Sequence, residues 1–267
     1  MSARLRGVAL LDALERGEVR VAERAADGSW HVHAWVKEEI LEIFRSSPVV
    51  AVGTDAAREL WPFVDKAALP PRRFDADGGV RLVPGGSSVR RGAHVASGVV
   101  CMPPMYINVG AFVGAGSMID SHALVGSCAQ IGERVHVSAA AQIGGVLEPI
   151  GARPVIVEDD VLVGGNTGLY EGVLVREGAV IAAGVVLTAG TPIYDLVHER
   201  ELRGTPDAPL EIPAGAVVVP GTRPASGAWG KQHGLSVACA LIVKYRDAST
   251  DRATALEDAL RPASEAP

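Results

Sequence analysis

The sequence predicts a mainly β protein built around a parallel β-helix of six-residue repeats, with a helical N-terminal domain and a small C-terminal extension of strand and helix. Two observations carry this prediction: aliphatic residues return at every sixth position, and glycines stand at fixed offsets from them. Period six fits neither the roughly 3.6-residue period of an amphipathic helix nor the alternation of a half-buried strand. The inward positions are Val89, Val95, Cys101, Ile107, Val113, Ile119, Val125, Ile131, Val137, Ile143, Val157, Val163, Leu169, Val175, Ile181, Leu187 and Ile193.

Each six-residue unit provides one short strand and one corner, and three units complete a triangular turn. An inward residue therefore lies eighteen positions from its neighbour in the core, as Val89 does from Ile107, at the ordinary strand spacing of about 4.8 Å. Glycine suits the corners because it tolerates a positive φ angle. Glycines that follow the inward residue by three positions are Gly92, Gly98, Gly110, Gly116, Gly172, Gly178, Gly184 and Gly190.

The register breaks between Ile143 and Val157, which lie 14 residues apart, two six-residue units plus two. The segment near 147–156 contains prolines and a glycine, so we expect a loop that leaves the coil at a corner. A loop that interrupts a regular solenoid often carries function. The polar segment 192–213 predicts a second loop, and Ala216–Gly221 predicts a return to the coil.

The N-terminal domain is expected over residues 1–75. Apolar residues recur at helical spacing around Leu10–Leu14 and within Ala34–Arg45, and Glu18–Val32 between them predicts a short hairpin or extended link. This domain can cap one end of the coil, whose terminal repeats would otherwise stay exposed.

The β-helix is expected over residues 76–222, and a C-terminal region over 223–267. That region contains a predicted strand at Leu235–Tyr245 and a predicted short helix at Thr250–Arg261. Together they would cap the other end of the coil.

Composition argues against several classes of partner. The net charge of −6 and the lack of a Lys/Arg cluster predict no nucleic-acid partner. No signal peptide and no stretch long enough to span a membrane is recognisable, so no membrane association is expected. The three cysteines, Cys101, Cys128 and Cys239, show no metal-ligand spacing, and we expect a reduced, cytoplasmic protein.

Asp120-Ser121-His122 is the polar group most open to a chemical role. No Ser-His-Asp spacing, phosphate loop, dinucleotide fingerprint or zinc motif accompanies it. Asp120 directly follows the inward Ile119, at a corner that usually holds a small residue. An aspartate at such a place either bonds its own turn or serves as an acceptor in chemistry, and the residues alone leave both open.

Longer segments carry a more specific resemblance. The run Val125–Gly132 (VGSCAQIG), within Ser117–Pro149, resembles the tetrahydrodipicolinate N-succinyltransferase family. The other matching segments are Leu10–Glu23, Trp30–Arg45, Val80–Pro84 and Ala240–Lys244. The resemblance covers nearly the whole chain. It implies a left-handed coil and a homotrimer with its sites between subunits.

By this resemblance the chain moves a succinyl group from succinyl-CoA to the amino nitrogen of tetrahydrodipicolinate, a small cyclic dicarboxylate, in diaminopimelate and lysine biosynthesis. Succinyl-CoA is then a co-substrate, and no permanently bound cofactor or metal is implied. The amine needs a general base, and the thioester oxyanion needs a donor such as a corner N–H. The implied residues are catalytic Asp120, His122 and Glu171; substrate-binding Arg81, Asp120 and Ser127; and CoA-binding Gly145, Gly165, Ala183, Gly184, Gly190 and Lys231.

Two positions depart from the family pattern. His122 stands where many members have tryptophan, and Gly168 stands where many have a glutamate; Glu171 matches a different glutamate. A mechanism with two carboxylates therefore does not transfer intact. We expect Asp120 to act alone or with His122, whose ordinary pKa of about 6.5 suits a base.

Two alternatives remain open at this point. The first is a tetrahydrodipicolinate N-acetyltransferase or another CoA-dependent amine N-acyltransferase, because the choice of donor depends on pocket shape. The second is a non-catalytic or zinc-dependent β-helix protein. A zinc site would need grouped histidines, and His94, His122 and His136 do not recur at one position of the coil.

Overall fold

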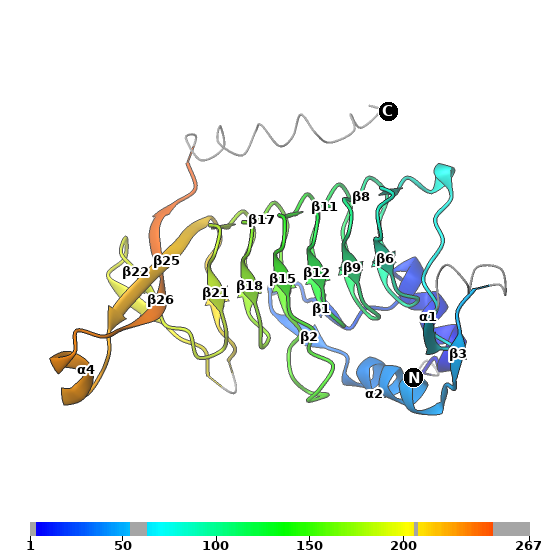
Figure 1. The fold of residues 1–267 in the computed structure, drawn as a ribbon, viewed down its shortest axis with the longest axis horizontal. Helices are drawn as coiled ribbons and strands as arrows, with labels where there is room; N and C mark the ends of the chain where they lie inside the picture. The colour runs from blue at the N-terminus through cyan, green and yellow to red at the C-terminus, as the bar shows by residue number, and fades with distance from the viewer. Residues whose placement is uncertain (1–3, 54–62, 206–207, 248–267) are drawn as a thin grey trace.

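Three parallel sheets form the sides of a triangular coil in the computed structural model, which describes residues 4–53, 63–205 and 208–247 (Figure 1). We name the sides A, B and C in the order in which the chain visits them from β6 onward. Side A contains β6 (Ser88–Val89), β9 (Tyr106–Ile107), β12 (Leu124–Val125), β15 (Gln142–Ile143), β18 (Gly168–Leu169) and β21 (Val186–Leu187). Side B contains β7 (His94–Val95), β10 (Phe112–Val113), β13 (Gln130–Ile131), β16 (Ile156–Val157), β19 (Leu174–Val175) and β24 (Glu211–Ile212). Side C contains β5 (Arg81–Leu82), β8 (Val100–Cys101), β11 (Met118–Ile119), β14 (His136–Val137), β17 (Leu162–Val163), β20 (Val180–Ile181) and β25 (Ala216–Pro224).

The strand register confirms the period of six. Val125 pairs in parallel with Ile107 and Ile143, each eighteen residues away. The inward residues from Val89 to Leu187 are buried in one continuous cluster that runs along the coil axis. Cys101 belongs to this cluster, and burial raises the pKa of its thiol to about 12. It therefore behaves as a small core residue.

The first loop enlarges one corner and leaves the coil otherwise intact. Ile131 pairs with Val157, 26 residues away, so residues 144–155 add eight residues to a single corner rather than two repeats plus two. The loop packs on the N-terminal domain: Lys37, which is fully buried, donates from Nζ to the Ala152 carbonyl at 2.6 Å. Leu147 of the same loop packs against the apolar cluster formed by α1, α2 and the coil corners at Val109 and Cys128.

The second loop changes which residue continues the ladder. The period assigned the place after Leu187 to Ile193, but Val175 pairs with Ile212 instead. Ile193 leaves side B and joins β22, beside β26. The coil therefore resumes at Ile212, inside the segment predicted as loop, 25 residues after Leu187. A long excursion can be of any length, so the period of six does not predict where the coil resumes.

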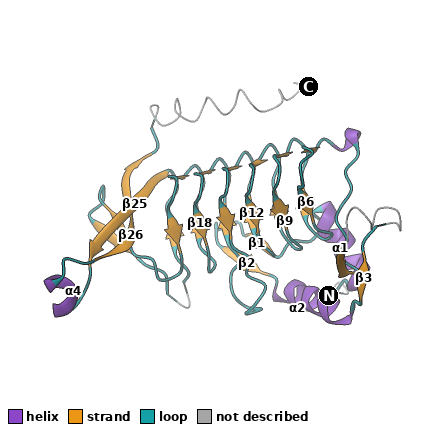
Figure 2. Ribbon diagram, viewed as in Figure 1, coloured by secondary structure: helices purple, strands orange, loops and turns teal. Residues whose placement is uncertain are grey.

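The N-terminal domain is less helical than predicted. It contains α1 (Gly7–Arg16) and α2 (Ala34–Ser46), with hairpin β1 (Ala22–Arg24) and β2 (Trp30–Val32) between them. A second hairpin, β3 (Val49–Ala51) with β4 (Val64–Lys66), and a short 3₁₀ turn at Ala76–Gly78 follow α2. The expectation of helix up to residue 75 is wrong for these segments, which alternate over too few residues to give a clear pattern. Figure 2 shows both helices gathered at one end of the row of coil strands.

This domain covers side B. Ala22 of β1 is buried against Ile156 and Leu174, the outward residues of β16 and β19. The apolar faces of α1 and α2 pack on Val109 and Cys128, at the corners between sides A and B. Side B is thereby removed from solvent over much of its length.

The C-terminal region extends side C. β25 pairs antiparallel with β26 (Ser236–Tyr245), and the sheet continues through β22 (Ile193–Asp195) and β23 (Arg200–Leu202). A short helix, α4 (Ala228–Gln232), lies at the tip of the β25–β26 hairpin (Figures 1 and 2). Buried Asp195 joins these strands, accepting hydrogen bonds from the Tyr245 hydroxyl at 2.8 Å and from Arg200 Nε at 3.0 Å. The helix predicted at Thr250–Arg261 lies outside the described residues.

Candidate active site

The corners of the coil line up along three edges. We call edge CA the row of corners at which the chain passes from side C to side A, and name edges AB and BC in the same way. Edge CA consists of residues 83–87, 102–105, 120–123, 138–141, 164–167 and 182–185. The candidate site residues on it are Asp120, His122, Gly165, Ala183 and Gly184. Neighbouring corners touch directly, because the Gly184 N–H donates to the Gly165 carbonyl at 3.0 Å.

Asp120 bonds its own turn with one oxygen and keeps the other for a second group. Its Oδ1 accepts a hydrogen bond from the Ser121 N–H at 2.6 Å. Its Oδ2 lies 3.5 Å from Nε2 of His136, and the Asp120 side chain is 29% exposed. Asp120 can therefore both stabilise its own turn and accept a proton, because the turn uses only one of its two carboxylate oxygens.

His136 is a neighbour of Asp120 that sequence reasoning missed. It lies on β14, beside Met118 of β11, and faces outward on side C. The signal was present in the sequence, because His136 follows Met118 by eighteen residues and Met118 precedes Asp120 by two. Reading the repeat across neighbouring turns would have brought the imidazole to the carboxylate.

His122 lies at the third residue after the inward one, with φ of 62°. This left-handed conformation recurs at corners occupied by Cys128, Arg134 and Ala140, so it belongs to the coil and does not by itself indicate function. His122 borders a shallow hollow of about 380 Å³ on side A, whose polar lining includes Gln142.

Arg81 reaches edge CA from the first strand of side C. Its Nη2 lies 3.7 Å from the sulfur of Met102, the residue one turn before Asp120 in the stack of corners. The Met102 N–H donates to the carbonyl of Ile119, which fixes that stacking. An exposed guanidinium and a partly exposed carboxylate therefore lie along one edge, at strands that are separated by β8 alone.

The remaining candidates lie elsewhere in the chain. Ser127, Gly145, Glu171 and Gly190 lie along edge AB, where Glu171 Oε2 accepts a hydrogen bond from the Ala189 N–H at 3.0 Å. Lys231 lies in α4, at the tip of the C-terminal hairpin. A single chain does not bring them to Asp120, because each following corner of the repeat faces a different direction.

Comparison with known proteins identifies one enzyme family over most of the chain. A family model described as “Tetrahydrodipicolinate N-succinyltransferase N-terminal” matches residues 8–45, and one described as “Hexapeptide repeat of succinyl-transferase” matches residues 154–189. The 2,3,4,5-tetrahydropyridine-2,6-dicarboxylate N-succinyltransferase of Nitrobacter hamburgensis is 44% identical over 258 residues, covering 94% of this chain and 87% of the relative. The chain belongs to the tetrahydrodipicolinate N-succinyltransferase family.

Other relatives in this family have similar figures. The enzyme of the same name from Bradyrhizobium diazoefficiens is 44% identical over 260 residues, and that from Idiomarina loihiensis is 42% identical over 256. A solved structure from Campylobacter jejuni, titled a putative 2,3,4,5-tetrahydropyridine-2-carboxylate N-succinyltransferase, matches with a TM-score of 0.50 at 18% identity. It covers 90% of this chain and 63% of its own, and supports the fold alone.

Within this family pattern, the structure explains the departure at Gly168. A Cβ atom added at Gly168 would lie 2.5 Å from Cε2 and 3.0 Å from the hydroxyl of Tyr170. One added at Gly144 would lie 2.7 Å from Cδ1 of the same ring. The Tyr170 side chain therefore covers both glycines and fills the space that a side chain at position 168 needs. The glycine and the tyrosine are a matched pair.

The described parts of the chain show no group of three or more His, Cys, Asp or Glu side chains that could hold a metal ion. In the same residues, no helix combines the length and apolar character needed to cross a bilayer. The cysteines are free, and all three are buried.

Proposed function

We propose that this chain transfers the succinyl group of succinyl-CoA to the amino nitrogen of tetrahydrodipicolinate, in its hydrated or ring-opened form, as a step of diaminopimelate and lysine biosynthesis. The observation that carries the proposal is the identity of 44% with an enzyme of this name across 94% of the chain. That likeness runs through the N-terminal domain and the coil together, whereas the six-residue repeat alone is common to many acyltransferases.

The chemistry requires one proton acceptor and one oxyanion donor. The amine nitrogen attacks the thioester carbonyl, the new C–N bond forms and the C–S bond breaks. CoA leaves as a thiolate and takes up a proton, while the attacking amine releases one. Asp120 Oδ2 is the acceptor that we assign, because Oδ1 is already held by the Ser121 N–H. A backbone N–H of a nearby corner would stabilise the oxyanion.

Substrate and donor are then arranged along edge CA. Arg81 supplies a cation for a carboxylate of the acceptor, beyond the corner of Met102. The small residues Gly165, Ala183 and Gly184 allow the pantetheine arm to approach the backbone. In this arrangement the acceptor lies toward the N-terminal end of the coil and CoA toward the C-terminal end.

A site shared between subunits of a homotrimer, each with a left-handed coil, completes the proposal. Side A adjoins edge CA and is not covered by the N-terminal domain. Val186 on this side is 55% exposed, and Tyr106 and Leu124 are only partly buried. The coil of a neighbouring subunit, placed against side A, would cover these apolar residues. It would also bring its own edge AB residues, Glu171 among them, toward Asp120.

An assay of CoA release that compares succinyl-CoA with acetyl-CoA as the acyl donor tests this function. CoA release should require tetrahydrodipicolinate, and kcat/KM should be greater with succinyl-CoA than with acetyl-CoA. Equal or better use of acetyl-CoA would instead assign the chain as an N-acetyltransferase. Release of CoA that does not depend on the acceptor, or no release with either donor, would reject amine acylation altogether.

We expect His122→Ala to lower kcat and to change its dependence on pH, because the variant loses an imidazole at the corner that holds Asp120. Its kcat should fall by less than the roughly 10²-fold typical of losing a sole general base, because Asp120 remains. The measurement is kcat and kcat/KM against pH, with exposed His31→Ala as the control. A normal turnover and an unchanged profile would exclude a base role for His122.

A further inference from the structure

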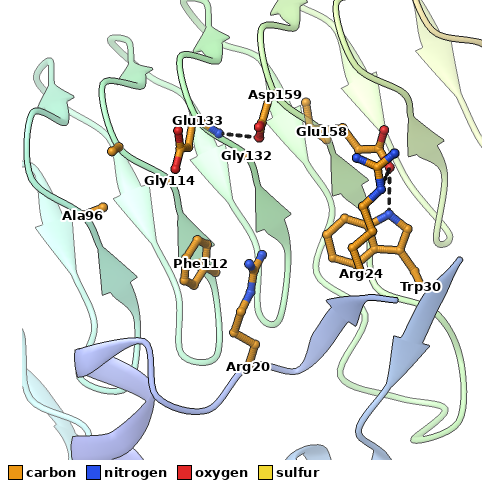
Figure 3. Close-up of a pocket in the computed structure, with 12 residues that line it drawn as sticks. Arg20, Arg24, Trp30, Ala96, Phe112, Gly114, Gly132, Glu133, Glu158 and Asp159 are labelled. Atoms are coloured by element: carbon orange, nitrogen blue, oxygen red, sulfur yellow. Dashed lines mark hydrogen bonds and ion pairs between the residues drawn. The ribbon is translucent and has the colours of Figure 1, made fainter. Parts of the chain in front are cut away.

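A separate cavity of about 290 Å³ lies between the β1–β2 hairpin and the coil, over side B and edge BC (Figure 3). Its polar lining consists of Arg20, Arg24, Glu133, Glu158 and Asp159. Trp30 of the hairpin and Phe112 of β10 supply its aromatic walls (Figure 3). Edge CA lies on the other side of the strands of side C, so the reaction proposed above does not use this space.

Arg20 is the unusual group in this cavity. Its guanidinium carbon lies 3.6 Å from the centre of the Phe112 ring, and its Nε donates to Gln130 Oε1 at 3.1 Å. None of the ion pairs found among residues 4–53, 63–205 and 208–247 includes Arg20, and no hydrogen bond from its two terminal nitrogens is found there. Figure 3 shows the side chain extending from the N-terminal segment toward the coil, beside Phe112. Burial lowers the pKa of Arg20 to about 10, so it still carries its charge at neutral pH.

Arg24 provides the contrast. Its Nε lies 3.6 Å from Glu158 Oε1, which also accepts hydrogen bonds from Trp30 Nε1 at 2.9 Å and Arg176 Nη1 at 3.0 Å. Arg24 therefore already has a carboxylate at ion-pair distance within the wall. Arg20 alone presents donors to the cavity without a carboxylate to receive them, and a planar guanidinium is well suited to bind a carboxylate with two hydrogen bonds.

The opposite rim is acidic. Glu133 and Asp159 have side chains 54% and 47% exposed, and Asp159 Oδ1 accepts a hydrogen bond from the Glu133 N–H at 2.9 Å. Arg134, outside the cavity, donates from Nη1 to Glu133 Oε2 at 2.8 Å, and its Nη2 lies 3.9 Å from Asp159 Oδ2. Arg20 and this rim place a cation and two carboxylates around one cavity, an arrangement that suits a ligand carrying both a carboxylate and an ammonium group.

The floor is formed by small residues, and the close stacking of neighbouring corners requires the two glycines among them. Gly114 and Gly132 follow the inward residues of β10 and β13, and Ala96 and Ala115 lie beside them. A Cβ added at Gly132 would overlap Oδ1 of Asp159, and one at Gly114 would lie 2.5 Å from the carbonyl group of Gly132. The volume is close to the lower end, about 300 Å³, of ordinary small-molecule pockets.

We propose that this cavity binds a small α-amino acid, with its carboxylate on Arg20, its ammonium group toward Glu133 and Asp159, and its side chain against Phe112 and Trp30. The bound molecule would join the N-terminal hairpin to the coil. Because no residue of edge CA takes part, the site is independent of the succinyl transfer proposed above.

Isothermal titration calorimetry on the full chain tests the proposal, using the common L-α-amino acids and L-norvaline, with pentanoate and butylamine as probes that keep only one of its two charges. We expect at least one amino acid to bind, and pentanoate and butylamine to bind at least about tenfold more weakly than L-norvaline, equivalent to about 1.4 kcal/mol. Absence of binding by every amino acid, or equal binding of the single-charge probes, would overturn the proposal.

Variants locate the site. Arg20→Gln should weaken amino acid binding by about tenfold or more, whereas Arg16→Gln, an exposed arginine paired with Glu18, should leave it unchanged. Ala115→Leu should also weaken binding by filling the cavity without touching the cation, which covers the case in which Arg20→Gln fails to fold. Binding unchanged in folded Arg20→Gln, or in Ala115→Leu, would contradict the assignment. Arg20→Gln should retain succinyl transfer in the absence of amino acid, so the two proposals fail separately.

Discussion

Asp120→Asn is expected to lower kcat for succinyl transfer by roughly 10²- to 10⁴-fold, the usual contribution of a positioned general base. The amide keeps an oxygen that can still accept from the Ser121 N–H, so the turn should survive. What is lost is the negative oxygen beside His136 that takes the proton of the amine. Steady-state CoA release against succinyl-CoA and acceptor concentration measures the effect, which should fall on kcat more than on either KM.

The matched control is Asp160→Asn. Asp160 is also an aspartate at a coil corner, but on edge BC, where it forms an exposed ion pair with Arg134 at 2.7 Å. Exposed pairs of this kind contribute about 0–1 kcal/mol, so stability and kcat should both change little. If Asp120→Asn retained near-normal turnover while folded, or if both variants lost activity equally, Asp120 would not be the base.

Gly126→Ala is expected to destabilise the protein by about 3 kcal/mol, at the upper end of ordinary overpacking costs. The added Cβ would overlap the backbone nitrogen of Gly145 and lie 2.6 Å from its Cα and 2.8 Å from the carbonyl carbon of Gly144. These are backbone atoms at the start of the loop 144–155, so no side-chain rotation can relieve the contact. Edge AB would have to open where the loop leaves it.

Denaturant unfolding at a fixed protein concentration measures this cost, since assembly makes apparent stability depend on concentration. Gly151→Ala is the control, because a Cβ there meets no atom within 4 Å and the residue lies in the same loop. A midpoint for Gly126→Ala equal to that of Gly151→Ala would show that the corners are not packed as closely as described.

The period of six was sufficient to predict the parallel coil and its inward residues, because stacking at a constant interval forces every eighteenth residue into contact. Contacts between neighbouring turns could also be predicted from the sequence, because the interval of eighteen residues places His136 beside Met118 and so near Asp120. The change from Ile193 to Ile212 could not be predicted, since nothing in a loop sequence states how many residues it spends away from the coil.

Side-chain direction was the other limit of sequence reasoning. Gly168 marked an absent acid, but only the structure shows the ring of Tyr170 lying over it, because a corner residue can turn toward either adjacent side. The cavity at Arg20 likewise depends on how the β1–β2 hairpin docks on side B, which the two short strands of that hairpin do not specify.

The central claim is that one edge of the coil, edge CA, receives the donor, and cysteine protection by CoA tests it most directly. Ala183 on edge CA and Glu177 on edge BC are both exposed and both lie two residues after an inward residue, so Ala183→Cys and Glu177→Cys are matched reporters. The native thiols of Cys101, Cys128 and Cys239 are 0%, 0% and 7% exposed, and burial raises the pKa of each, so they should alkylate slowly. Saturating CoA should slow iodoacetamide labelling of Ala183→Cys several-fold and leave Glu177→Cys unchanged. Protection of Glu177→Cys, or none at Ala183→Cys, would contradict the account.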